Sequence, residues 1–105
     1  IFMNLNEFQA HIEDKLPALD SFYDKAINYQ LEKDKRRPPK KRWSEAKIER
    51  AANAMYKDLM KGIYEKIKSL VEEREKKPND VWIDYLEKYE LYEQINESLY
   101  EIEFD

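Results

Sequence analysis

Apolar residues recur at steps of three and four between residues 44 and 77, which is the longest regular pattern in the chain. This spacing places them on one face of an α-helix. Ser44 stands where an N-cap residue is expected, and Pro78 cannot continue the helical hydrogen bonds. The pattern therefore predicts a long central helix over residues 44–77, with an inner face made by Ile48, Ala52, Met55, Leu59, Ile63, Ile67 and Leu70.

The same spacing runs through the N-terminal third of the chain and predicts a first helix over residues 4–33, with Asn4 or Asn6 as its cap. Pro17 lies inside this pattern, where it removes one N–H and crowds the carbonyl four residues back. We expect a kink or a break near Lys15. If the helix breaks, its second piece should begin at Asp20 or Ser21.

A third helix is predicted over residues 80–99. Its inner stripe is Trp82, Tyr85, Leu86, Tyr89 and Tyr92, continued less regularly by Ile95 and Leu99. Beyond it, apolar and acidic residues alternate with a strand-like period of two over residues 100–105. We expect this acidic tail to fray and to pair only with a partner.

These elements predict an all-α fold in a single helical domain over residues 1–105. Three long helices joined by short connections form an antiparallel three-helix bundle, or a four-piece variant if Pro17 divides the first helix. The chain has one glycine and four prolines, which leaves little material for β-turns.

The composition limits the cellular compartments in which we expect this protein. The chain has no cysteine, which excludes disulfides and thiolate zinc sites, and no apolar run approaches the roughly 18 residues of a membrane span. We expect a cytoplasmic protein with no membrane association. Whether Ile1 and Phe2, which precede Met3, are native stays open. Lysine outnumbers arginine fourteen to five, a bias common in proteins encoded by AT-rich DNA, so we expect a low-GC bacterium or its phage.

Catalytic and metal-binding patterns are weak. His11 is the single histidine, and with Glu7 and Asp14 it supplies only part of a metal shell. No serine has a histidine near it in sequence, and Gly62 alone, inside a helix, makes no phosphate loop. Gly62 either allows a neighbouring helix to approach closely or lowers helix stability. We therefore expect no enzyme activity, no metal and no cofactor.

A basic segment separates the first two helices, and its two prolines predict a loop over residues 34–43. Its cations could neutralise phosphates, and its tryptophan could stack on an unpaired base or pack under an arginine. The alternative without a binding function is a solvated loop whose charge is balanced by the acidic helix, within one molecule or between copies. The residues proposed to bind nucleic acid are Lys35, Arg36, Arg37, Lys40, Lys41, Arg42 and Trp43.

An acidic segment forms the other charged region. Residues 80–105 hold nine carboxylates and a single cation, Lys88. Carboxylates spaced by three or four make a stripe that could imitate nucleic-acid phosphates and occupy a basic surface of another protein. The alternative without a binding function is that this stripe is simply the solvated outer face of the helix. The residues proposed to bind a partner are Asp84, Glu87, Tyr89, Glu90, Tyr92, Glu93 and Glu97.

The sequence thus favours a non-catalytic helical protein that binds a macromolecule, most simply a protein-binding inhibitor or adaptor that uses its acidic, tyrosine-rich helix. The alternatives are a nucleic-acid accessory protein that uses the basic loop, and a structural homodimer in which the basic loop of one copy meets the acidic helix of another. Tyr64, off the inner stripe of the central helix, is a further interface candidate, although tyrosines at stripe borders more often line a core.

Overall fold

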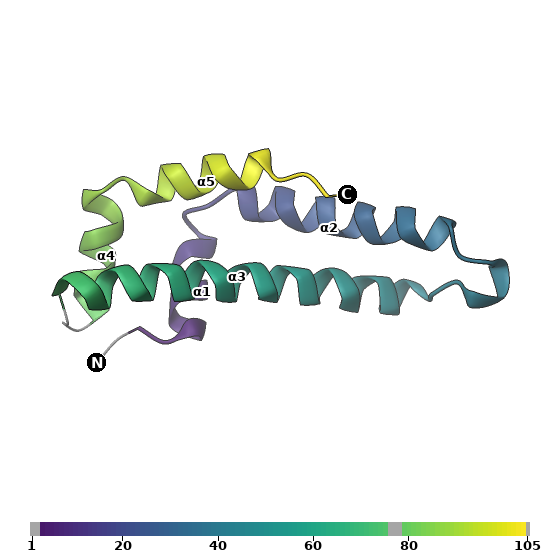
Figure 1. Cartoon of the computed structure of the whole chain (residues 1–105), viewed down its shortest axis with the longest axis horizontal. Helices are drawn as coiled ribbons and strands as arrows, with labels where there is room; N and C mark the ends of the chain where they lie inside the picture. The colour runs from purple at the N-terminus through teal and green to yellow at the C-terminus, as the bar shows by residue number, and fades with distance from the viewer. Residues whose placement is uncertain (1–2, 76–78, 105) are drawn as a thin grey trace.

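A computed structural model of the chain describes residues 3–75 and 79–104. These residues form no strand, and the expected all-α class is confirmed. The three-helix bundle is not matched, because two of the three predicted helices are each divided (Figure 1). The elements are α1 (Leu5–Glu13), α2 (Ala18–Lys35), a 3-10 turn η1 (Pro39–Lys41), α3 (Glu45–Glu75), α4 (Asn79–Lys88) and α5 (Leu91–Glu101).

The first predicted helix breaks at Pro17, as the alternative allowed. The Asn4 side chain caps α1 by accepting from the Glu7 N–H at 2.8 Å, and the Glu7 carboxylate accepts from the Asn4 N–H at 3.0 Å. The second piece begins at Ala18 rather than at Asp20 or Ser21. Its first N–H donates to Oδ1 of Asn96 in α5 at 2.9 Å, so a residue far along the chain satisfies the start of α2.

The hairpin of α2 and α3 runs along the long axis of a molecule that measures 54 × 24 × 21 Å (Figure 1). The Ser44 hydroxyl accepts from the Lys47 N–H at 3.2 Å, so the predicted start of α3 is correct. With 31 residues, α3 is about 46 Å long at the usual helical rise. The predicted end of this helix at Lys76, Lys77 and Pro78 lies outside the described residues.

The predicted helix 80–99 turns a corner. It stops at Lys88 and resumes at Leu91, and Glu90 between them adopts a left-handed conformation with φ 53° and ψ 34°. This conformation costs about 1–2 kcal/mol for a residue other than glycine. The corner lets α4 pack on α3 while α5 turns back and packs on α2. Neither glycine nor proline marks it in the sequence, which is why the prediction of one straight helix was wrong.

The main core lies where α1 and α4 meet α3. The indole of Trp82, which is fully buried, stacks on the Tyr64 ring with centroids 5.4 Å apart and meets the edge of Phe8 at 5.9 Å. The Tyr64 hydroxyl donates to the Met3 carbonyl at 2.6 Å. Tyr64 therefore belongs to the margin of this core and is not a free interface residue.

The C-terminal tail packs on α2 of its own chain. Phe104 meets Phe22 at a centroid distance of 5.4 Å and Tyr29 at 5.3 Å. The Lys25 ammonium donates to the carbonyls of Tyr100 and Ile102, at 2.9 and 3.1 Å. The expectation that the tail frays is wrong for residues 102–104, because its alternating apolar side chains find their partner surface within the molecule.

Beyond the tail, α2 and α3 continue as a two-helix arm over residues 30–51, which no other described helix covers. Inside it Gln30 is buried, and its amide donates to the Met55 sulfur at 3.2 Å. The loop at the end of this arm is the predicted basic loop, but α2 extends to Lys35, two residues beyond the predicted end of the helix at residue 33.

Trp82 offers a test of the core. We expect Trp82→Ala to lower the free energy of unfolding by about 3–5 kcal/mol through the cavity it leaves. Trp82→Phe should cost roughly half as much, because the indole N–H is buried without an acceptor among the described residues and its removal leaves no polar group unpaired. Urea unfolding measures both. Leu31→Ala, at a residue that is 42% exposed, is the control, and an effect as large as that of Trp82→Ala would contradict this account of the core.

Candidate functional site

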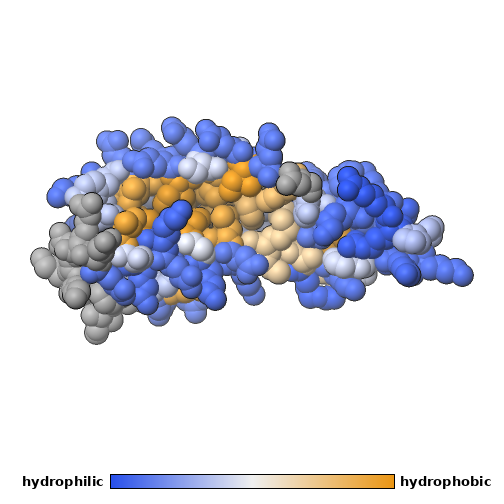
Figure 2. All heavy atoms as spheres, in the orientation of Figure 1, coloured by the Kyte–Doolittle hydropathy of each residue, from blue (hydrophilic) through white to orange (hydrophobic). Residues whose placement is uncertain are grey.

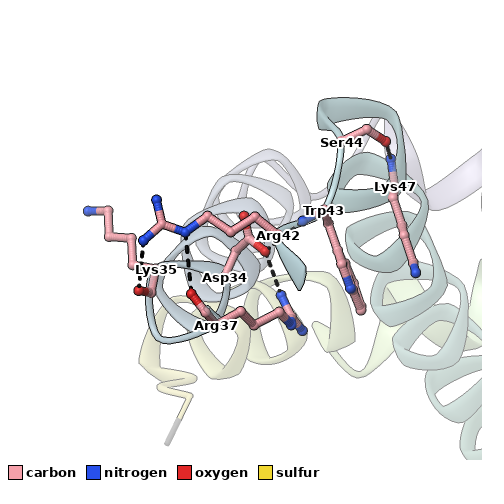
Figure 3. A network of polar contacts seen from close by, with 7 residues as sticks. All are labelled: Asp34, Lys35, Arg37, Arg42, Trp43, Ser44 and Lys47. Carbon is pink, nitrogen blue, oxygen red and sulfur yellow. Dashed lines mark hydrogen bonds and ion pairs between the residues drawn. The ribbon is translucent and has the colours of Figure 1, made fainter. Parts of the chain in front are cut away.

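The end of the arm, residues 33–50, is hereafter called the basic tip, and it is built around one carboxylate. Oδ1 of Asp34 accepts from the Trp43 N–H and from Nη1 of Arg37, both at 2.9 Å (Figure 3). The Arg42 guanidinium donates, at longer distances of 3.4 and 3.5 Å, to the carbonyls of Arg37 and Lys35. The loop is thus closed on itself by short-range polar contacts.

The Trp43 ring is enclosed by cations of its own chain. The Arg37 guanidinium carbon lies 3.8 Å from the ring centroid and the Lys47 nitrogen lies 4.5 Å from it. Figure 3 shows the ring between these two side chains. Of the two roles predicted for Trp43, packing under an arginine is the one the structure contains. Stacking on an unpaired base would first require Arg37 or Lys47 to move away.

The same contacts set the ionisation of Asp34. The hydrogen bond from the Trp43 N–H, aided by the neighbouring charges of Arg37 and Arg42, holds the pKa of the Asp34 carboxyl below its usual 3.8 in spite of partial desolvation. Asp34 is therefore ionised at neutral pH, as its role as a double acceptor requires.

The other cations of the basic tip face solvent. Arg36, Lys40 and Lys41 are exposed and form no ion pair with a described residue, and Lys35 pairs with Glu32 at 3.0 Å, with both side chains well exposed. Residues 33–50 hold nine cations against three carboxylates. The seven residues predicted to bind nucleic acid thus divide: Arg37 and Trp43 are half-buried in the loop's own network, and the other five are exposed.

The acidic residues lie on a different part of the molecule. Asp84 and Glu87 project from α4, Glu90 stands at the corner, and Glu93 and Glu97 project from α5; all five are exposed. They do not form the single helical stripe that was predicted, because the corner at Glu90 divides it into two short ones. We call these five carboxylates, with the exposed Tyr89 and Tyr100, the acidic face.

The tyrosines of this region have separate roles. Tyr89 is 42% exposed and lies against the Tyr85 ring, with centroids 4.9 Å apart. Tyr92, in contrast, is half-buried, and its hydroxyl shares a hydrogen bond with Nε2 of His11 in α1. Burial, and then the negative charge of Glu87, raise the pKa of Tyr92. Tyr92 therefore joins α5 to α1 and presents little free surface.

Tyr100 is a surface residue that the sequence reasoning missed. It is 49% exposed, the largest value among the described large apolar and aromatic side chains. Its spacing in the sequence could have indicated this exposure. Glu97 follows Glu93 by four residues and Tyr100 follows Glu97 by three, so all three lie on the outer side of α5. The helix had been predicted to end one residue earlier, at Leu99.

The two charged regions do not neutralise each other within the molecule. Among the described residues the ion pairs are Lys35–Glu32, Arg37–Asp34 and Lys68–Glu72, and none joins the basic tip to α4 or α5. Along the tail, Glu103 and Phe104 line an open groove of about 500 Å³ together with Lys33 of α2 and with Arg36, the residue that follows α2. Both charged regions therefore keep most of their charge exposed to solvent.

Other chemistry finds little support in the described part of the chain. No three histidine and carboxylate side chains there come together as a metal shell would require; Glu7 serves the α1 cap and His11 contacts Tyr92. None of the described helices has an apolar stretch long enough to cross a bilayer. Comparison with protein-family models, with curated proteins and with solved structures finds no match.

Asp34 gives a pH prediction for the basic tip. Its pKa is lowered by folding, so its stabilising contacts are complete above the unfolded value of about 3.9 and are lost as the pH falls through the lower, folded value. We expect the carboxyl carbon of Asp34, followed by NMR, to titrate with a midpoint below 3.8. The Trp43 amide signal should move with the same midpoint. Asp34→Asn should abolish that movement, and a midpoint at or above the ordinary aspartate value would contradict the network.

Proposed function

We propose that this chain acts without catalysis, as a small binding protein whose acidic face engages a basic surface of a partner protein, in the manner of an adaptor or an inhibitor. The observation that carries the proposal is that exposed carboxylates and exposed tyrosines are interspersed on α4 and α5, with no ion pair to any described residue.

Physical considerations support a cationic partner. Glu93 and Glu97 are four residues apart on α5, and Glu101 follows at the same spacing, so each neighbouring pair raises the free energy of the helix by a few tenths of a kcal/mol. A partner that brings lysines or arginines to this side relieves the repulsion. Tyr89 and Tyr100 add apolar area with a polar end, which is common at the centres of protein interfaces. The charges also accelerate encounter with a basic surface.

Charge reversal tests this proposal. We expect Glu87→Lys, Glu90→Lys and Glu93→Lys together to abolish capture of the partner that the wild-type protein retains from extracts of its own host, because the repulsion then acts at the contact. Mass spectrometry identifies the partner, and binding of that purified protein is then measured by calorimetry.

The matched control replaces Asp24, Glu49 and Glu65, which are also exposed, by lysine, with the same change in net charge. It should bind as the wild type does. Equal loss in both variants would indicate a nonspecific effect of net charge, and retained binding in the first variant would refute the role of the acidic face.

A second candidate function uses the basic tip to hold a nucleic-acid backbone. It is favoured by Arg36, Lys40 and Lys41, which project from the end of the arm with no described counter-ion. Because both faces of Trp43 are covered, such binding would depend on phosphate contacts alone. It should therefore be sensitive to salt and indifferent to base sequence.

Oligonucleotide binding across a range of salt concentrations tests the second candidate. We expect Arg36→Ala, Lys40→Ala and Lys41→Ala together to reduce the slope of log affinity against log salt by up to about 3 for duplex DNA. Lys15, Lys57 and Lys61, which are exposed elsewhere, replaced by alanine are the control. Absence of binding at low salt would exclude this function, and a strong preference for unpaired bases that is lost in Trp43→Leu would show that stacking, not backbone contact, drives it.

A further inference from the structure

An apolar strip lies between α3 and α5 on one face of the molecule. Figure 2 shows it as a band along the long axis, bordered on both sides by polar side chains. Half-buried apolar residues at helical spacing on the two helices account for it, since α5 packs on α2 and α4 but no described helix covers the gap toward α3. They are Met55, Leu59, Ile63 and Leu70 of α3 with Leu91 and Ile95 of α5 and Ile102, the residue that follows α5.

Gly62 lies at the edge of this strip, beside Ile63. A Cβ atom added there would meet nothing within 4 Å, so no part of this molecule needs a glycine at this position. Glycine in a helix interior nevertheless lowers stability by about 0.5–1 kcal/mol relative to alanine. Of the two roles that the sequence suggested for Gly62, close approach of a helix is therefore open only to a helix from another molecule.

The surface around Gly62 is complementary to itself. If a second α3 runs antiparallel with a two-fold axis at Gly62, Asp58, four residues before it, faces Lys66 of the other copy, four residues after it. The symmetry forms this contact twice. Asp58 and Lys66 are exposed and form no ion pair with a described residue. The same register brings Met55 of each copy within one residue of Leu70 of the other.

We propose that a second copy of this chain covers the strip, with the two α3 helices antiparallel and crossing at Gly62. Each α3 then lies in the gap between α3 and α5 of the other copy, as in a four-helix layer. The contact is isologous and closes after two copies. It does not depend on the proposed function, because Glu93 and Glu97 point from the other side of α5 and the basic tip lies at the end of the arm.

Gly62→Gln separates this dimer from folding. The new side chain enters open space in the monomer, so the unfolding temperature of the monomer should stay the same or rise with the better helix propensity. It cannot fit where two helices cross closely. In sedimentation velocity across the micromolar to millimolar range, we expect the wild type to be a dimer and Gly62→Gln a monomer. Ala46→Gln, at an exposed residue in the first turn of α3 and on the opposite side of the helix from Gly62, is the control and should remain a dimer.

Exchange of the two charges tests the register. Asp58→Lys alone and Lys66→Asp alone should each weaken dimerisation by about tenfold or more, since each puts like charges together at two symmetric places. The double variant restores both pairs and should recover wild-type affinity, which a merely structural role of either residue would not predict. A wild-type protein that stays monomeric throughout the range, a Gly62→Gln variant that stays dimeric, or failure of the double variant to recover would each overturn the proposal.

Discussion

The pairing of α2 with α3 is the contact on which the rest of the structure depends. These two helices are much longer than the others, and their antiparallel contact sets the long axis of the molecule. The other three helices cover only the part of the hairpin that lies toward the α2 N-terminus, so the core gathers there and the arm projects beyond it. The helices α1, α4 and α5 are too short to extend along the whole length of α2 and α3. The separation of the basic tip from the acidic face is therefore a consequence of unequal helix lengths.

Within the basic tip, one carboxylate decides which cations are available. Asp34 holds the Trp43 N–H and the Arg37 guanidinium, and the stack of Arg37 on Trp43 follows from that geometry. The network stabilises the loop while it half-buries two of the seven residues, Arg37 and Trp43, on which the prediction of nucleic-acid binding rested. What remains for a partner is a set of flexible point charges, which can hold a phosphate backbone or an acidic surface but has little means to read bases.

Much of the fold could be predicted from the local sequence pattern, and the errors of that prediction have a common cause. The helical spacing predicts where helices exist, Ser44 predicts the start of α3, and Pro17 predicts the division of α1 from α2. The corner at Glu90 could not be predicted, because the burial of Trp82 against α3 and of Leu99 on α2 compensates an unfavourable backbone conformation that no local residue signals. The prediction for the tail was wrong for a related reason. The alternation of apolar and acidic residues shows that Ile102 and Phe104 need a partner surface, but it does not show whether that surface belongs to the same molecule. The exposed residues of the two charged regions were predictable from composition, and packing under an arginine was one of the two roles predicted for Trp43. The hydrogen bond between Tyr92 and His11, in contrast, had no signal in the sequence.

Charge segregation and the apolar strip together bear on how copies of this chain would associate. A contact between the basic tip of one copy and the acidic face of the next joins two different surfaces, so it propagates into open chains unless the geometry happens to close. In the antiparallel arrangement centred on Gly62, α3 extends about 25 Å toward the basic tip and about 20 Å toward α4 at the usual helical rise. The tip of each copy then extends toward the α4 end of the other, where Asp84 and Glu87 are exposed. Opposite charges that come within a Debye length of about 8–10 Å in this arrangement would favour it over the parallel one. In the proposed dimer, opposite charges at the two ends would thus favour the antiparallel arrangement, while the apolar strip would supply the area that it buries.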